Sequence, residues 1–200
     1  MRTFIAVDLS EGIRAKIKDI QQHFFDLGIV ENVKLKFVNP RQAHQTVKFL
    51  GDVPKDRVEG VKRALEGISQ KPFDIVLKGV GFFPEASPEK VRNIRVVWVG
   101  MEKGVEELKA LQREVESKMH ALGFPLEKRF SSHVTLFRVK KGSRAGSSDE
   151  IGRLLKKIAE LREVEVGEMR VDELKLKHST LTPKGPIYED VYVKRLEEQE

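Results

Sequence analysis

The chain has 200 residues, which is enough for one domain of ordinary size or for two small lobes that share a core. Lys and Arg number 37 against 31 Asp and Glu, so the formal net charge is +6, and this modest excess permits a phosphate-bearing partner but is also typical of an ordinary solvated surface. Cysteine is absent, which excludes disulfides, thiolate catalysis and Cys-ligated metal sites and suits a reducing cytosol.

Membrane insertion is not expected from the sequence. The opening segment MRTFIAVDLS has too short an apolar run for a signal peptide, and Asp8 interrupts it. No stretch approaches the roughly 18 consecutive apolar residues that a membrane-spanning helix needs. We therefore expect a cytoplasmic protein.

Apolar residues recur with periods of two and of about 3.6 along the chain, which predicts strands and helices mixed through one fold. Ser10 is a good N-cap and Gly28 a good helix end, so a helix is expected between them. The elements predicted in the first half are a strand over 3–9, this helix, a strand over 33–38, an extended octet over 44–51 and a helix over 56–68.

The second half repeats this order. It predicts an antiparallel pair of strands over 73–83 and 93–99, a helix over 105–122, an octet over 133–140, a basic Gly/Ser-rich loop from Lys140 to Arg144, a helix over 150–161 and strands over 163–177 and 187–194. The sequence strand, helix, octet therefore occurs before and after about residue 100. We predict an internal duplication, with two similar lobes that place the octets on facing sheets.

The first octet reads HQTVKFLG. In a strand, alternate side chains point to the same face. Alternation places His44, Thr46 and Lys48 on one face and Val47 and Phe49 on the other, which faces the core. Lys48 is expected either to contact a phosphate or to be a solvated residue at the edge of the sheet.

The second octet reads HVTLFRVK and has the same form. Alternation directs His133, Thr135 and Phe137 outward, with Val134 and Leu136 in the core. A single His-x-Thr in a strand is more often a packing or surface feature than a catalytic one. Because the pattern recurs in the same phase and in similar lobes, we interpret the two histidines as a functional pair.

Two facing imidazoles have a clear chemical use. With an unperturbed pKa of about 6.5, one can accept a proton while the other donates one near pH 7. The threonine hydroxyls are suited to the nonbridging oxygens of a phosphate held between the strands. Neither octet has a second His, Asp or Glu at metal-ligand spacing, and the sequence contains no HExxH, P-loop or GxSxG motif. We therefore expect a device for attacking a phosphodiester that needs no metal and no cofactor.

These motifs resemble those of the 2H phosphoesterases, and most closely the branch of RNA 2′,3′-cyclic phosphodiesterases, also called 2′-5′ RNA ligases or LigT-like proteins. The resemblance covers nearly the whole chain, and its segments are MRTFIAVDL, KFVNPRQAHQTVKFLGDV, RVVWVG, FSSHVTLFRVK and STLTPKGPIY. It implies a single bilobal α+β domain over 1–200. Each lobe would contribute an antiparallel sheet and helices, with the active cleft between the two pseudo-symmetric lobes.

The resemblance also implies an activity. A terminal 2′,3′-cyclic phosphate on RNA would be hydrolysed to a 2′-phosphate, and the reverse reaction with an RNA 5′-hydroxyl would give 2′-5′ ligation without ATP. His44 would donate a proton to the leaving 3′ oxygen, His133 would activate water, and Thr46 and Thr135 would hold the phosphate. The expected partner is an RNA with a cyclic phosphate end, such as a tRNA fragment, and the expected oligomeric state is a monomer.

Three residues of the second motif region need separate treatment. Ser132 stands where the family usually has proline. Phe137 stands where a small or aliphatic residue is common, and it is expected either to stack on a base or narrow the cleft, or to pack at the junction of the lobes. Arg138 matches an arginine that commonly follows the second motif, but alternation places it away from His133, so a phosphate contact requires a β-bulge or a strand end.

Two other functions remain open at the level of sequence. One is an RNA-binding module that holds RNA without turnover, and the other is a phosphodiesterase for small cyclic nucleotides. Paired histidines favour an enzyme over a binding module, because Arg and Lys bind phosphate as well or better and keep their charge near neutral pH.

Overall fold

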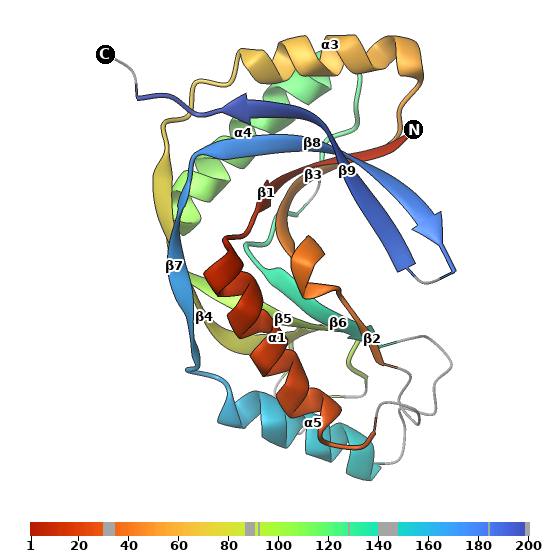
Figure 1. The fold of residues 1–200 in the computed structure, drawn as a ribbon, viewed down its shortest axis with the longest axis vertical. Helices are drawn as coiled ribbons and strands as arrows, with labels where there is room; N and C mark the ends of the chain where they lie inside the picture. Colours follow the sequence, from red (N-terminus) through yellow and green to blue (C-terminus); the bar gives the residue numbers. More distant parts are fainter. Residues whose placement is uncertain are drawn as a thin grey trace.

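The computed structural model describes residues 1–29, 35–86, 91, 93–127, 129–139, 148–183 and 185–198. The start of the strand expected over 33–38 and the basic loop from Lys140 to Arg144 lie outside these residues. Within them, two antiparallel sheets and four α-helices form a mixed fold (Figure 1), which confirms the predicted α+β class. None of the described helices is long and apolar enough to cross a membrane.

The strands divide into two sheets. Sheet A has the strand order β3-β1-β8-β9, and its members are β1 (Arg2–Asp8), β3 (His44–Asp52), β8 (Glu173–Thr182) and β9 (Gly185–Arg195). Sheet B has the order β2-β6-β5-β4-β7, and its members are β2 (Leu35–Phe37), β4 (Phe73–Phe83), β5 (Val96–Lys103), β6 (Val134–Val139) and β7 (Glu165–Val171).

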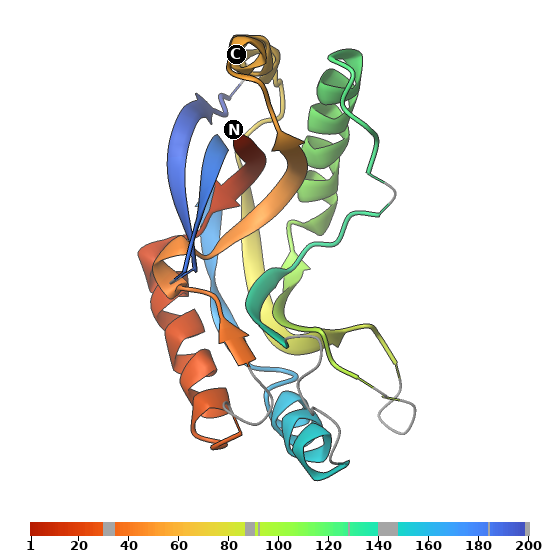
Figure 2. The same ribbon diagram turned by 90° about the vertical axis from the view of Figure 1, so that its right-hand side faces the viewer.

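The helices lie in two groups, with α3 and α4 toward one end of the molecule and α1 and α5 toward the other (Figures 1 and 2). Their bounds are α1 (Glu11–Phe25), α3 (Lys55–Glu66), α4 (Val105–Ala121) and α5 (Ser148–Glu160), and a short 3₁₀-helix, η1, covers Pro40–Gln42. As expected, Ser10 is the N-cap of α1, and its side chain accepts a hydrogen bond from the backbone N–H of Ile13.

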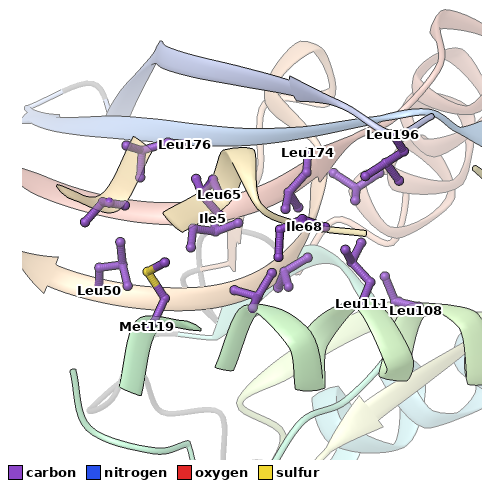
Figure 3. Packing of buried hydrophobic residues seen from close by; sticks show 14 of the residues in the cluster. Ile5, Leu50, Leu65, Ile68, Leu108, Leu111, Met119, Leu174, Leu176 and Leu196 are labelled. Carbon is purple, nitrogen blue, oxygen red and sulfur yellow. The ribbon is translucent and has the colours of Figure 1, made fainter. Parts of the chain in front are cut away.

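Two hydrophobic clusters hold the sheets and helices together. In the first, residues of sheet A pack against α3 and α4 (Figure 3), with fully buried side chains such as Ile5, Leu65 and Leu111. The second joins α1 and α5 to sheet B and includes Phe24 and Phe137. Each sheet therefore buries one face against its own pair of helices.

The predicted duplication is visible in the topology. In sheet A the strand that opens the chain, β1, is followed by α1 and pairs antiparallel with the octet strand β3. In sheet B the strand β5 is followed by α4 and pairs antiparallel with the octet strand β6. The two octets thus occupy equivalent places in two similar units.

One predicted strand is wrong, because the structure divides it between the two sheets. The strand expected over 163–177 is two strands, since β7 ends at Val171 in sheet B and β8 begins at Glu173 in sheet A. In Figure 1 they follow one another almost without interruption, so the chain passes from one sheet to the other there. The apolar pattern does not reveal this change, because the backbone stays extended on both sides. β8 also continues to Thr182, beyond the predicted end of the strand at residue 177.

The first cluster yields a stability prediction. Leu111 on α4 has no exposed surface, so Leu111→Ala removes apolar contacts and leaves a cavity. We expect urea denaturation to show a loss of about 2–5 kcal/mol in the free energy of unfolding. The control is Leu126→Ala, because Leu126 is 57% exposed and its loss should change the free energy by about 0.5 kcal/mol or less. Equal effects of the two substitutions would contradict this packing.

Candidate active site

The two octets meet at one pocket. A cavity of about 670 Å³ between the sheets is lined by His44 and Thr46 of the first octet and by His133 and Thr135 of the second. His44 begins β3, and His133 directly precedes β6. A cavity of about 680 Å³ beside β4 and α5 has no lining residue from either octet. The pocket between the sheets is therefore the candidate active site.

Both histidines are oriented in the same way. Nδ1 of His44 lies 2.8 Å from the carbonyl oxygen of Gln42, and Nδ1 of His133 lies 3.1 Å from that of Ser131. A carbonyl oxygen only accepts hydrogen bonds, so Nδ1 is the protonated nitrogen in each neutral ring. Nε2 is then the nitrogen that exchanges protons with a substrate in both residues.

Two aromatic rings hold the His44 imidazole. The ring of Phe4 on β1 lies 4.9 Å from it, and the ring of Tyr188 on β9 lies 5.3 Å from it at 85°, measured between centroids. Tyr188 also lines the pocket. The octet motifs predict neither ring, because both rings come from strands far away in the sequence.

The rings beside His133 come from sheet B. Phe83 lies 5.2 Å from the imidazole at 90°, and Trp98, which sequence analysis did not connect with the site, lies 6.4 Å away. A Cβ at Gly81 would lie 2.3 Å from the Trp98 ring, so only glycine leaves space for the indole there. Both histidines are thus fixed by aromatic packing as well as by a backbone hydrogen bond.

A β-bulge changes the phase of the first octet. β1 pairs Ala6 with Thr46 and Ile5 with Lys48, which leaves Val47 without a partner. Val47 and Lys48 consequently both face the core, each only 1% exposed. The expectation that Lys48 shares the face of Thr46 is therefore wrong.

Lys48 has a structural place instead. Its Nζ donates to Glu116 Oε1 of α4 at 2.7 Å and to the carbonyl oxygen of Pro125 at 2.9 Å. The Glu116 carboxylate also accepts from Gln112 Nε2 at 3.2 Å and from the backbone N–H of Glu127 at 2.7 Å. This buried ion pair satisfies both charges and ties β3 to α4, so Lys48 is not available to a phosphate in the pocket.

The same bulge occurs in the second octet. β5 pairs Trp98 with Thr135 and Val97 with Phe137, so Leu136 is the unpaired residue. Phe137 is completely buried, and its ring lies 5.0 Å from the rings of Phe24 and Phe37. Of the two roles open for Phe137, the structure shows packing and contradicts base stacking.

The bulges also bring two residues into the site. Arg138 returns to the face of His133 and Thr135 and lines the pocket, as the family pattern required and strict alternation denied. The equivalent residue of the first octet is Phe49, which was expected in the core but is 62% exposed and lines the pocket as well. The two halves of the site therefore differ, with a cation on one side and an aromatic ring on the other.

Gln45 connects the two octets and was also missed. It is only 1% exposed, and its Nε2 donates to the carbonyl oxygens of Thr46 at 2.8 Å and Ser131 at 3.3 Å. The Ser131 oxygen is the one that also accepts from His133. Beside it, the buried Ser132 hydroxyl has no hydrogen-bond partner among the described residues.

The electrostatic surroundings of the histidines differ. Burial lowers the pKa of both, and in each the carbonyl oxygen bound to Nδ1 opposes that effect. Asp8, which pairs with His44 across the sheet, also raises the pKa of His44, while Lys177 and Arg14 lower it; Arg138 lowers the pKa of His133 further. Among the described residues, no three His, Asp or Glu side chains gather as a metal site would require.

We expect NMR titration to place the pKa of both histidines below the usual value of about 6.5. Arg138→Gln should raise the pKa of His133 and Asp8→Asn should lower that of His44, because each removes one nearby charge. Since the folded pKa values lie below the unfolded ones, protonation favours unfolding, and stability should fall as the pH drops below about 6.5. A histidine that titrates above this value would contradict the assignment.

Lys48→Met tests the buried ion pair. Methionine keeps most of the side-chain volume but leaves the Glu116 carboxylate without its countercharge, so we expect a loss of roughly 3–5 kcal/mol in the free energy of unfolding. The control, Lys62→Met, breaks the exposed pair with Glu59 and should cost about 1 kcal/mol or less. Similar losses in the free energy of unfolding, measured by urea denaturation, would show that the Lys48 pair contributes no more to stability than the exposed pair.

Comparison with known proteins gives matches along most of the chain. A model of the family described as LigT-like phosphoesterase matches residues 7–92 and 99–188. A Methanothermobacter thermautotrophicus protein named RNA 2′,3′-cyclic phosphodiesterase is 42% identical over 200 residues, covering 98% of this chain and 99% of the relative. An Archaeoglobus fulgidus protein with the same name is 38% identical over 194 residues, covering 96% and 99%.

Solved structures share the fold. A crystal structure of a Thermus thermophilus protein has a TM-score of 0.75 and 26% identity, covering 98% of both chains. The crystal structure of E. coli LigT in its apo form has a TM-score of 0.73 and 21% identity, again covering 98% of both chains. The family model spans most of the chain and relatives align along nearly its full length, so this protein belongs to the family of LigT-like phosphoesterases.

Proposed function

We propose that this protein hydrolyses the 2′,3′-cyclic phosphate at the end of an RNA to a 2′-phosphate. The observation that carries the proposal is the pocket, which is lined by two histidines and two threonines from equivalent strands. Nδ1 of each histidine is hydrogen-bonded to a backbone carbonyl oxygen. The names of the full-length relatives support the same activity.

In this mechanism His133 is the base. Its lowered pKa keeps Nε2 unprotonated near neutral pH, so it can take a proton from the attacking water. The water oxygen forms a bond to phosphorus while the bond from phosphorus to the 3′ oxygen breaks. His44 donates its Nε2 proton to that 3′ oxygen. Burial, Lys177 and Arg14 disfavour the protonated form of His44 that this step needs, and Asp8 and the negative phosphate favour it.

The remaining pocket residues stabilise the phosphate. Thr46 and Thr135 donate their hydroxyl protons to nonbridging oxygens, and Arg138 supplies positive charge where negative charge develops. If an RNA 5′-hydroxyl attacked phosphorus in place of water while the same bond to the 3′ oxygen broke, these groups would join two ends through a 2′-5′ linkage without ATP. We propose that no metal or other cofactor takes part.

We further propose that residues 1–200 act as one bilobal domain, because each sheet supplies half of the pocket. A monomer is then sufficient for catalysis. The cysteine-free sequence suits a cytoplasmic location, where RNA ends such as those of tRNA fragments are available substrates.

Two alternative functions are a phosphodiesterase for small cyclic nucleotides and a binding module without turnover. A small cyclic nucleotide is a candidate substrate, because a pocket of about 670 Å³ is large enough for one nucleotide. A binding module without turnover is less consistent with the site, since Arg and Lys would hold a phosphate as well as or better than imidazoles and keep their charge near pH 7.

The proposal is tested with a short RNA that ends in a 2′,3′-cyclic phosphate, incubated with the protein in EDTA. We expect a 2′-phosphate product and a decrease of about 10²–10⁴-fold in kcat for His44→Ala and for His133→Ala, because each removes one proton-transfer group. The acidic limb of kcat/KM against pH should report the base and lie below pH 6.5.

The matched control is His23→Ala, because His23 is an exposed residue of α1 outside the pocket. It should leave the rate unchanged. A cyclic end that survives while the RNA still binds would support the binding module instead. Turnover that is equally fast in the His44 and His133 variants would refute the two-histidine mechanism.

A further inference from the structure

A second pocket adjoins the candidate active site. It has a volume of about 320 Å³ and is lined by three cationic side chains, those of Arg14 near the start of α1, Arg41 of η1 and Lys177 of β8, and by two carboxylates, those of Asp8 and Asp190. Tyr188 lines both this pocket and the larger one. None of the steps proposed above uses these cations, so the pocket requires a separate explanation.

The two pockets lie on the same face of sheet A. Lys177 pairs across the sheet with Phe4, whose ring contacts His44. The carbonyl oxygen that accepts from His44 belongs to Gln42, which also lines the second pocket. A ligand that extends from the cyclic phosphate past the Tyr188 ring therefore reaches the second pocket directly.

The charges in this region are only partly balanced. Lys177 lies 2.5 Å from Asp190 and 3.0 Å from Asp8, and Lys175 lies 3.2 Å from each of the same carboxylates. These two lysines and two carboxylates neutralise one another. Arg14 is 3.8 Å from Asp8, which is a weak additional contact. The positive charge of the two arginines is thus left in excess.

Both arginines have donors to spare. Nε of Arg14 is buried and has no acceptor among the described residues, and buried donors without an acceptor are rare in proteins. Arg41 is exposed, and no described carboxylate lies within 4.0 Å of its guanidinium. Its backbone is held in η1, where its N–H donates to Asn39 Oδ1 at 3.0 Å. A planar guanidinium is well suited to bind two oxygens of a phosphate.

We propose that this second pocket binds the phosphate on the 5′ side of the terminal nucleotide, one nucleotide upstream of the cyclic phosphate. The ribose of that nucleotide would then lie beside Tyr188 and connect the two phosphates. This inference rests on the proposed function, and it names what that function recognises in an RNA end. A cyclic phosphate on a free nucleoside lacks the upstream phosphate and would bind less tightly.

The experiment compares three substrates: adenosine 2′,3′-cyclic phosphate, the same compound with a 5′-phosphate, and the dinucleotide ApA with a terminal 2′,3′-cyclic phosphate. We expect kcat/KM to be at least about tenfold higher for the second and third substrates than for the first, because their KM is lower. Arg41→Ala should lower the ratio of kcat/KM for the second or third substrate to that for the first about tenfold. It should also reduce the slope of log kcat/KM against log salt by about 0.7 for the dinucleotide.

The control is Arg63→Ala, because Arg63 is an exposed arginine on α3 and lines neither pocket. It removes the same charge and should leave the ratio unchanged. A preference for ApA without any preference for the 5′-phosphorylated nucleotide would overturn the proposal, since the upstream sugar or base would then be recognised. An equal effect of the Arg41 and Arg63 substitutions would overturn it as well.

A binding measurement separates this proposal from the proposed function. Calorimetry with adenosine 2′-phosphate and adenosine 2′,5′-bisphosphate needs no turnover. We expect the bisphosphate to bind about tenfold more tightly to the unaltered protein and to lose that advantage in Arg41→Ala. If no cyclic phosphate is hydrolysed but this difference holds, the catalytic proposal fails and the phosphate site stands. Equal affinities would refute the site whatever the activity.

Discussion

The pocket depends on a β-bulge that is present in both octet strands. In each strand one residue directly after the threonine, Val47 or Leu136, has no partner on the neighbouring strand. Two consecutive side chains then turn toward the core, and the next one returns to the pocket. Without the bulge, Arg138 would point away from the histidines. The duplication of the bulge explains why two units with different sequences build matching halves of one site.

The buried pair of Lys48 and Glu116 stabilises this arrangement in sheet A. A lysine placed in the core by the bulge is tolerated because Glu116 and the Pro125 carbonyl oxygen satisfy its ammonium group. In sheet B the equivalent residue is Phe137, which packs among aromatic rings without needing a charged partner. The same backbone feature is therefore held by an ion pair in one half and by apolar packing in the other.

The two halves also surround their histidines with different charges. Both imidazoles present Nε2 and both are held by a backbone carbonyl oxygen, so their orientation alone does not distinguish an acid from a base. The nearby charges differ, because Asp8 favours the protonated form of His44 while Lys177 and Arg14 oppose it, and Arg138 disfavours that of His133. The pseudo-symmetric fold thus supplies two similar groups with unequal neighbours, and in the proposed reaction His44 is the acid and His133 the base.

The sequence by itself determined the α+β class, the duplication and the pairing of His44 with His133. Periodicity and the His-x-Thr motif are local properties of each segment, so they can be recognised and compared without knowing which strands are neighbours. Only the tertiary structure decided which neighbours reach the pocket. The bulge is defined by pairing with another strand, and the partner of Lys48 lies 68 residues away on α4. Strict alternation therefore misplaced Lys48 and Phe137, since a one-residue slip in register moves each later side chain to the opposite face.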